Sequence, residues 1–341
     1  MPTRSKFARL LEHRYARRAI TLPLTALLAV AGVLLAPITI LVAAILDRGR
    51  PWQRVRLVVL ITGGLFIELL GVLGSLLTWI LTGFGLFRNQ EWTWRMHRPL
   101  MAVYTSTLIW FIARVMGTRV EWRSRDQQLD GPVLLLARHT SFFDALIPAT
   151  VLARDHRRVP HHVLTAGLRY MPCIDLVGHR FPNRFIRRTP GDGSAELGEI
   201  RRLAGLVHDR SAALIFPEGT FRNPQRFERA IRRLRRRHAE LADRAETFNH
   251  VLPPRPQGSF ALTQGAPEAD ILVCVNTGLE PFGTLDEIKT SLVAERPIIV
   301  ETWTIPAADV PDTPDEFNLW LMDVYADIDQ WVSDQLAAPS S

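Results

Sequence analysis

Two long stretches with almost no charge near the N-terminus most constrain how this chain can fold. Residues 19–46 carry no charged side chain, and residues 57–87 carry only Glu68. Each stretch exceeds the roughly 20 apolar residues that a helix needs to cross a bilayer. The first is longer than the apolar core of a signal peptide, and no convincing cleavage site follows it. We therefore expect two membrane helices within residues 19–90, which either cross the bilayer or enter it as a hairpin.

Basic residues around these stretches bear on orientation. Residues 1–18 form a basic N-terminal segment, and arginines also lie in the connecting loop and after the second stretch. Positive charge marks the cytoplasmic side of membrane helices. The larger clusters lie at the two outer ends, which favours both ends in the cytoplasm. We expect a multi-pass protein of the cell (inner) membrane whose large C-terminal part faces the cytoplasm.

A third apolar segment follows within residues 91–118. Trp92 and Trp94 are typical of the membrane–water interface, and residues 100–115 are apolar except for Arg114. This run is shorter than a membrane span. We expect an interfacial helix that lies on the membrane or packs on the soluble domain.

From residue 119 onward short apolar runs alternate with helical patterns. Helices are predicted over residues 142–152, 195–209 and 226–247, and an amphipathic closing helix over residues 317–332. Alternation of strands and helices predicts an α/β domain over residues 119–336, with a mostly parallel central sheet flanked by helices. The predicted strands contain Val120–Trp122, Val133–Ala137, Val163–Thr165, Phe185–Ile186, Ala212–Phe216, Val251–Leu252, Ile271–Val275 and Ile298–Val300.

The charge, cysteine and histidine content of the chain limits which partners and metal sites are expected. The net charge of +7 suits anionic partners such as membrane surfaces, phosphorylated substrates or nucleic acid. Cys173 and Cys274 are far apart, which indicates neither a zinc site nor a disulfide framework. His156, His161 and His162 lack acidic partners at zinc-binding spacing, so we predict no metal site there.

A histidine and an aspartate lie where a predicted strand gives way to a helix. His139 follows the apolar run Val133–Ala137, and Asp144 comes shortly after it. Catalytic groups are common at such strand ends in α/β sheets. If the backbone turns here, the Asp144 carboxylate can fix the imidazole tautomer and leave the other nitrogen as a base. The alternative is that Ser141 and Asp144 form only a capping box.

Further polar residues follow two other predicted strands. Arg187 and Arg188 end a short strand, and arginine side chains suit phosphate binding, although exposed arginines usually bind nothing specific. The strand Ala212–Phe216 leads into Pro217-Glu-Gly-Thr220, which could be turn chemistry alone. Arg255 lies in a proline-rich segment beyond them.

Taken in order, these blocks resemble the four motifs of the glycerolipid acyltransferases, the superfamily that includes the lysophosphatidate acyltransferases. The resemblance covers about residues 76–331 and is closest to the lysocardiolipin and lysophosphatidate acyltransferase branch. The stretches that carry it are His139 to Asp144, Phe185-Ile-Arg-Arg188, Phe216-Pro-Glu-Gly-Thr220, Pro254-Arg-Pro-Gln-Gly258 and the tail from Ile305 to Trp320.

The resemblance implies a membrane-bound enzyme of the 1-acylglycerol-3-phosphate O-acyltransferase type. It would move a fatty acyl group from acyl-CoA or acyl carrier protein to the hydroxyl of a lysophospholipid, with membrane lipids as further partners. His139 would act as general base and Asp144 would orient it, a contribution of about 10²–10⁴-fold in rate. No metal or organic cofactor is implied, because the thioester is a co-substrate.

The resemblance also implies where the acceptor binds. Glu218, Gly219 and Thr220 match the block linked to acceptor binding, and Arg187 and Arg188 lie where the family holds the acceptor phosphate. We favour Arg188 for that contact. Further candidate substrate-binding residues are Arg222 and Arg255.

Two departures from the family pattern keep other functions open. Arg138 stands where the family usually has Asn, and Phe221 follows Thr220 where many members have Arg, so Arg222 is shifted by one position. The shift leaves room for a glycolipid acceptor. A third hypothesis is a non-catalytic membrane protein that binds anionic lipid.

A basic segment over residues 226–238 adds a possible anion contact. Its first interpretation is a solvated surface helix, and the second is contact with lipid headgroups or with the phosphates of CoA. Nucleic acid is not an expected partner, because no recognition fold accompanies this helix.

Overall fold

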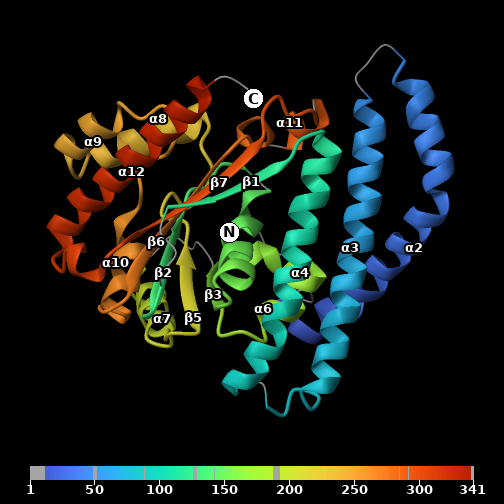
Figure 1. Cartoon of the computed structure of the whole chain (residues 1–341), viewed down its shortest axis with the longest axis horizontal. Coiled ribbons are helices and arrows are strands. Elements are labelled where there is room, and N and C mark those ends of the chain that lie inside the picture. Colours follow the sequence, from blue (N-terminus) through green and yellow to red (C-terminus); the bar gives the residue numbers. More distant parts are fainter. Residues whose placement is uncertain are drawn as a thin grey trace, which may run out of the picture.

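The computed structural model places three long helices beside an α/β domain (Figure 1). The predicted α/β class with a mostly parallel sheet is confirmed. The structure describes residues 12–48, 52–87, 89–125, 129–141, 143–186, 193–283, 285–290 and 292–338.

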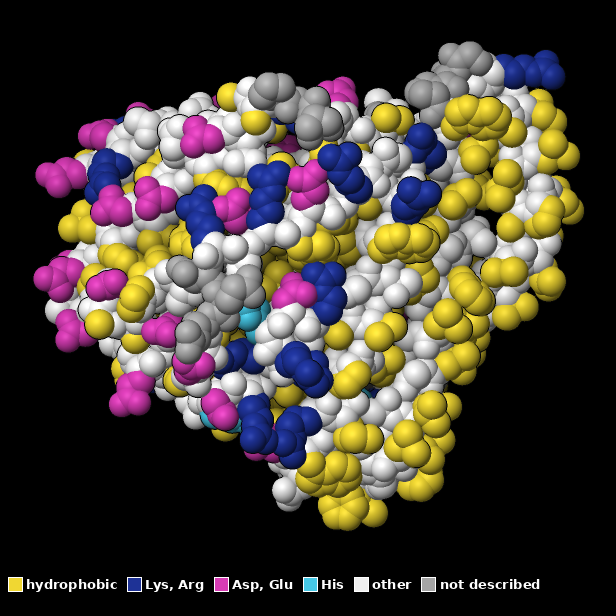
Figure 2. Space-filling view, viewed as in Figure 1, with side chains coloured by type: hydrophobic (Ala, Val, Ile, Leu, Met, Phe, Trp, Pro, Cys, Tyr) yellow, Lys and Arg dark blue, Asp and Glu magenta, His cyan; other side chains and the backbone are white. Residues whose placement is uncertain are grey.

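The three long helices are α2 (Arg14–Leu46), α3 (Gln53–Leu81) and α4 (Glu91–Met116). Each is long and apolar enough to cross a membrane. Helices α2 and α3 pair along their length and expose many large apolar side chains, which Figure 2 shows gathered on one side of the molecule. Helix α4 begins earlier than the apolar run suggested and continues through Pro99. Its residues Ile109, Ile112 and Ala113 are buried in the core of the α/β domain.

Among the residues that the structure describes, seven strands form the sheet, in the order β1-β7-β6-β2-β5-β3-β4. Strands β6, β2, β5, β3 and β4 run parallel, whereas β7 is antiparallel to β6 and carries β1 parallel to itself. Parallel strands bring their carboxyl ends to one edge, where α/β proteins build their sites. The strands are β1 (Val120–Ser124), β2 (Val133–Ala137), β3 (Val159–Thr165), β4 (Arg184–Ile186), β5 (Ser211–Ile215), β6 (Asp270–Thr277) and β7 (Ile298–Ile305).

Alternate residues of the buried strand β2 serve two cores. Val133 and Leu135 face α4 and the short helical run after β2, whereas Leu134 and Leu136 face the other layer of helices. The α4 side contains η1 (Asp144–Leu146), α5 (Ile147–Thr150) and η2 (Val151–Asp155). The other side contains α7 (Ser194–Ala204), α8 (Pro224–Arg235), α9 (Ala239–Ala245), α10 (Pro256–Gly265) and α12 (Pro314–Ala337).

Short elements complete the domain. They are η3 (Ala166–Tyr170), α6 (Pro172–Gly178), η4 (Glu280–Phe282), α11 (Leu285–Thr290) and η5 (Ala307–Asp309).

Two predictions about local structure were wrong. The strand predicted at Val251–Leu252 is a buried loop, because its N–H groups bond to carboxylates of Asp329 and Glu218 and not to a neighbouring strand. The single helix predicted over residues 226–247 is two helices, α8 and α9. The chain turns between them, which brings Leu241 and Ala245 into the core.

Helix α3 is attached to the α/β domain at several points along its length. The Gln53 side chain donates to the carbonyl of Ile288, within α11, at 2.9 Å. Farther along, Glu68 accepts from the backbone N–H of Cys173 at 2.7 Å, at the start of α6. Arg180 then donates to the Ser75 hydroxyl at 2.6 Å. The helix therefore lies against the domain and does not project away from it.

Candidate active site

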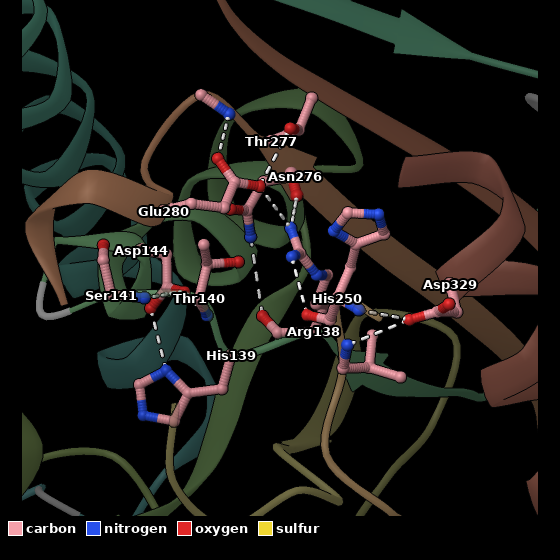
Figure 3. Close-up of polar contacts among 12 residues, drawn as sticks. Arg138, His139, Thr140, Ser141, Asp144, His250, Asn276, Thr277, Glu280 and Asp329 are labelled. Carbon is pink, nitrogen blue, oxygen red and sulfur yellow. Dashed lines mark hydrogen bonds and ion pairs between the residues drawn. The ribbon is translucent and has the colours of Figure 1, made fainter. Parts of the chain in front are cut away.

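His139 lies directly beyond β2, at the carboxyl edge of the sheet. Its Nδ1 is 3.0 Å from Oδ1 of Asp144 (Figure 3). The imidazole packs against Phe216, with ring centroids 4.7 Å apart, and against Phe221 at 5.8 Å. Its side chain is 20% exposed, whereas Asp144 is fully buried. The structure thus brings together the two residues that we predicted as a catalytic pair.

Asp144 has a second task besides contacting the imidazole. Its Oδ2 accepts the backbone N–H of Thr140 and, at 2.9 Å, that of Ser141. The capping interpretation and the catalytic interpretation are therefore compatible, since each oxygen serves one of them. A carboxylate fixed in this way accepts a hydrogen bond from Nδ1, which leaves Nε2 of the neutral imidazole as the basic nitrogen.

Glu218 connects the histidine to a second loop. It lies beyond β5, just before Gly219, whose φ of 69° permits the tight turn. Glu218 Oε1 accepts the backbone N–H of His139 at 2.7 Å, and Oε2 accepts that of Leu252 at 2.9 Å. Burial raises the pKa of Glu218 to about 7, against the opposing effect of these two bonds. Glu218 therefore holds two segments of main chain together at the site.

Arg138, which the sequence marked only as a departure, proves to be a buried hub. Its side chain is 1% exposed and forms an ion pair with Glu280 at 3.0 Å. It also donates to the carbonyl of His250 at 3.0 Å and to that of Asn276 (Figure 3). Arg138 thereby ties the end of β2 to the end of β6 and to the loop that precedes Leu252. The unusual residue next to His139 was the only sequence signal for this network.

Asp329 of α12 supports the same loop from the other side. Its carboxylate accepts the N–H groups of Asn249 at 3.0 Å, His250 at 2.6 Å and Val251 at 3.1 Å. Neither Glu280 nor Asp329 was singled out in the sequence. No local pattern indicates that helix α12 would reach this loop.

The predicted substrate-binding side chains differ in where the structure places them. Glu218, Thr220 and Arg255 line one cavity of about 900 Å³. Arg222 does not line it. Its guanidinium lies over the ring of Phe227 at 4.6 Å, and burial lowers its pKa. The predicted phosphate contacts Arg187 and Arg188 lie outside the described residues.

Gly219 and Arg255 contribute through the main chain. The Gly219 N–H closes the turn onto the Phe216 carbonyl at 2.9 Å, and the Arg255 N–H donates to the Pro217 carbonyl at 2.8 Å. The block after β5 is therefore tied to the start of α10 as well as to His139.

The residues at this edge of the sheet lie in a range that matches a known protein family. Residues 119–264 match the sequence model of the acyltransferase family, and this range contains His139, Asp144, Glu218 and Arg255. This range of the chain is therefore similar to the acyltransferase family. The matched range thus includes the His139–Asp144 pair at the end of β2 and Glu218, which bonds to the backbone of His139 and Leu252. None of the curated proteins compared with the chain matched it.

A solved structure shares the fold of this chain. The crystal structure of the 1-acyl-sn-glycerophosphate (LPA) acyltransferase from Thermotoga maritima aligns with a TM-score of 0.50 and 13% sequence identity. The alignment covers 80% of this chain and 98% of that chain. It therefore includes part of the N-terminal helices as well as the α/β domain, since the domain alone is shorter than that share.

Proposed function

We propose that this protein transfers a fatty acyl group from a thioester donor, acyl-CoA or acyl carrier protein, to the hydroxyl of a lysophospholipid such as 1-acylglycerol-3-phosphate. The observation that carries the proposal is the contact between His139 and the buried Asp144 within a domain of the acyltransferase family. The apolar helices α2 and α3 beside that domain support a lipid acceptor.

The proposed reaction needs one base and no cofactor. His139 Nε2 removes the proton of the acceptor hydroxyl, and the oxygen attacks the carbonyl carbon of the thioester. The tetrahedral intermediate collapses with cleavage of the carbon–sulfur bond. The imidazolium then returns its proton to the thiolate of the carrier, so protons and charge balance. Asp144 holds the imidazole in the required tautomer and stabilises its protonated form.

Glu218 takes a positioning role in this proposal. Because both of its oxygens bond to main-chain N–H groups, it fixes the backbone of His139. Thr220 and Arg255 border the neighbouring cavity and remain candidates for contact with a substrate. We retain Arg187 and Arg188 as proposed contacts of the acceptor phosphate.

We also propose that the membrane unit, residues 19–90, lies along the domain and inserts its exposed apolar face into one leaflet. Gln53 and Ser75 both contact the α/β domain and are about 33 Å apart along the helix axis, at 1.5 Å per residue. That length matches the roughly 30 Å hydrocarbon core. A membrane-crossing α3 would therefore draw the attached domain into the lipid.

The test is acyl transfer by the purified protein in lipid nanodiscs, with labelled acyl-CoA and a panel of lysophospholipids and glycolipids. We expect transfer to a lysophospholipid, and we expect His139→Ala to lower kcat by about 10²–10⁴-fold. His208→Ala is the matched control, because His208 also contacts an aspartate, Asp209 at 3.1 Å, but lies at the opposite edge of the sheet.

Three outcomes would contradict parts of this proposal. Full activity of the His139→Ala variant would reject the assigned base. Transfer only to a glycolipid would move the acceptor to that class, in line with the position of Arg222. Lipid binding without any thioester turnover would favour a non-catalytic lipid-binding protein.

A further inference from the structure

A cavity of about 900 Å³ borders Glu218 and lies outside the catalytic pair. It lies between α8, α10 and α12, and its apolar lining belongs to the core on that side of the sheet. The His139 ring packs on Phe216, which belongs to the opposite core, on the side of α4. The cavity and the imidazole therefore lie on opposite faces of the sheet and approach each other at its carboxyl edge.

One wall of the cavity is cationic. Arg226, Arg229 and Arg233 follow one another at helical spacing, so they share one face of α8, and Arg237 extends this wall beyond the helix end. Among the described residues, Arg229, Arg233 and Arg237 form no ion pair with an acidic side chain. These three side chains are exposed where they line the cavity, so their guanidinium groups can bind an anion that enters it.

The neighbouring Arg235 shows what the other face of α8 does. It forms ion pairs with Asp243 at 2.8 Å and Glu246 at 2.5 Å, both from α9. Arg235, which does not line the cavity, is thus paired with acidic side chains, whereas the arginines of α8 that line the cavity are not. Glu218 is the single acidic side chain among the described residues that line the cavity.

The opposite wall is largely apolar. It contains Phe260 of α10 and Leu321 and Met322 of α12, together with prolines from the segment that begins at Pro253. A ligand that suits both walls carries several negative charges on one side and apolar or aromatic groups on the other. Guanidinium groups favour phosphates in particular, because they bond to them through two parallel N–H groups.

The position of the cavity argues against the phosphate headgroup of a membrane lipid as its ligand. The exposed apolar side chains of α2 and α3 lie on the other side of the molecule (Figure 2). The site is also concave and of the size of small-molecule pockets, whereas a carrier protein would need an extended outer surface. A soluble, polyphosphorylated small molecule fits these observations best.

We propose that this cavity binds the phosphate-bearing nucleotide part of the thioester donor, which makes acyl-CoA the donor. This inference rests on the proposed function and assigns its donor site. The nucleotide lies against the arginines of α8, and the pantetheine arm passes the carboxyl edge of the sheet beside Glu218 toward His139. The lipid acceptor approaches from the face that carries the apolar helices. The two substrates therefore reach the base from opposite sides of the sheet.

The experiment compares the Arg229→Gln/Arg233→Gln variant with Arg232→Gln/Arg236→Gln. The second pair removes the same charge from the same segment at positions that do not line the cavity. Both full-length variants are assayed in phosphatidylcholine nanodiscs with acyl-CoA and with S-acyl-pantetheine, which lacks the nucleotide. Binding of adenosine 3′,5′-bisphosphate is measured separately by calorimetry.

We expect the cavity variant to bind adenosine 3′,5′-bisphosphate about 10-fold to 100-fold more weakly than the wild type. Its preference for acyl-CoA over S-acyl-pantetheine, as a ratio of kcat/KM values, should fall by a similar factor. The control variant should keep both quantities within about threefold, because Arg232 and Arg236 do not line the cavity and so do not contact its ligand.

Several results would overturn the inference. One is an equal loss of kcat/KM with both donors, and another is a loss as large in the control variant. A wild-type protein that uses acyl carrier protein and not acyl-CoA would also reject it. So would weakened binding to phosphatidylglycerol vesicles in the cavity variant together with unchanged nucleotide binding.

The same experiment separates this inference from the proposed function. If the wild type transfers no acyl group from any donor, but the cavity variant alone loses nucleotide binding, the nucleotide site stands and the acyltransferase proposal fails. If transfer proceeds from both donors with unchanged preference in the cavity variant, the function stands and the donor site is rejected.

Discussion

At the scale of single residues, the candidate site depends on two carboxylates with different surroundings. Asp144 is buried and accepts two main-chain N–H groups in addition to its contact with His139. Glu218 is also buried, and its hydrogen bond to His139 is made with the backbone N–H. Asp144 contacts the imidazole itself, whereas the hydrogen bond of Glu218 fixes the backbone that carries it.

The tautomer argument predicts the effect of Asp144→Asn. The amide can still accept the backbone N–H groups through its oxygen, but it then presents an NH₂ group to His139 Nδ1. This favours the wrong tautomer, so we expect kcat to fall by at least about 10²-fold with little change in KM. Steady-state kinetics at saturating donor would measure the change, and thermal unfolding would verify that the variant is folded. A kcat within about threefold of the wild type would rule out the orienting role.

The raised pKa of Glu218 predicts a pH-dependent stability. Its folded-state pKa of about 7 exceeds the ordinary value of 4.5, so the folded state binds the proton more tightly than the unfolded state. The resulting stabilisation is complete below about pH 4.5 and is lost as the pH rises through about 7. A shift of this size corresponds to about 3 kcal/mol.

The corresponding measurement is the unfolding free energy of the wild type and of Glu218→Gln between about pH 4 and about pH 8. The stability of the wild type relative to the variant should fall by about 3 kcal/mol over this range, because all other titrating groups are shared. A constant difference would show that Glu218 does not titrate there.

At the scale of secondary-structure elements, α12 matters more than its place at the end of the chain suggests. Asp329 binds three consecutive N–H groups of the loop at residues 249–251, and the next residue, Leu252, donates to Glu218. The order at His139 therefore depends on a chain of contacts that begins on the last helix.

Removal of the Asp329 carboxylate should loosen that loop. We expect Asp329→Ala to reduce the free energy of unfolding by about 3 kcal/mol, because buried N–H groups lose their acceptor. Asp323→Ala on the same helix is the matched control. It removes an exposed ion pair with Arg244, and we expect a loss below about 1 kcal/mol. Denaturant titration would measure the unfolding free energy of both variants. An equal loss of unfolding free energy in the two variants would contradict the role of Asp329 in holding the loop.

At the scale of the whole molecule, the sheet divides an apolar side from a charged side. Helices α2 and α3 cover the first, and helices α8, α9 and α12 cover the second (Figures 1 and 2). The contacts of α3 with residues near both α11 and α6 keep it alongside the domain. Arg17 and Arg18 at the start of α2 also pair with Asp175, at 2.5 and 2.6 Å, which anchors the hairpin at that end.

The proposed in-plane arrangement predicts on which side of the membrane the two helix connections lie. Single cysteines would be placed at Arg48→Cys, after α2, and at Asn89→Cys, before α4, in a background where the native cysteines are buried. A membrane-impermeant maleimide should label both positions from the same side of sealed vesicles. Labelling from opposite sides would show that α3 crosses the bilayer.

Much of this architecture could be predicted from the sequence because it depends on local periodicity. The uncharged stretches specify the long helices, and the alternation of short apolar runs with helical patterns specifies the α/β domain. The short separation of His139 and Asp144 made their contact predictable, because a single turn joins them.

Contacts between distant segments could be decided only by the tertiary structure. Glu218 and His139 are 79 positions apart, and Arg138 reaches the carbonyl of Asn276 across 138 positions. Val251–Leu252 has the apolar character of a strand, yet it forms a loop because side-chain carboxylates take its N–H groups. The local apolar pattern of a segment indicates that it is buried. The hydrogen-bonding partners of that segment are decided only when the layers of the fold pack together.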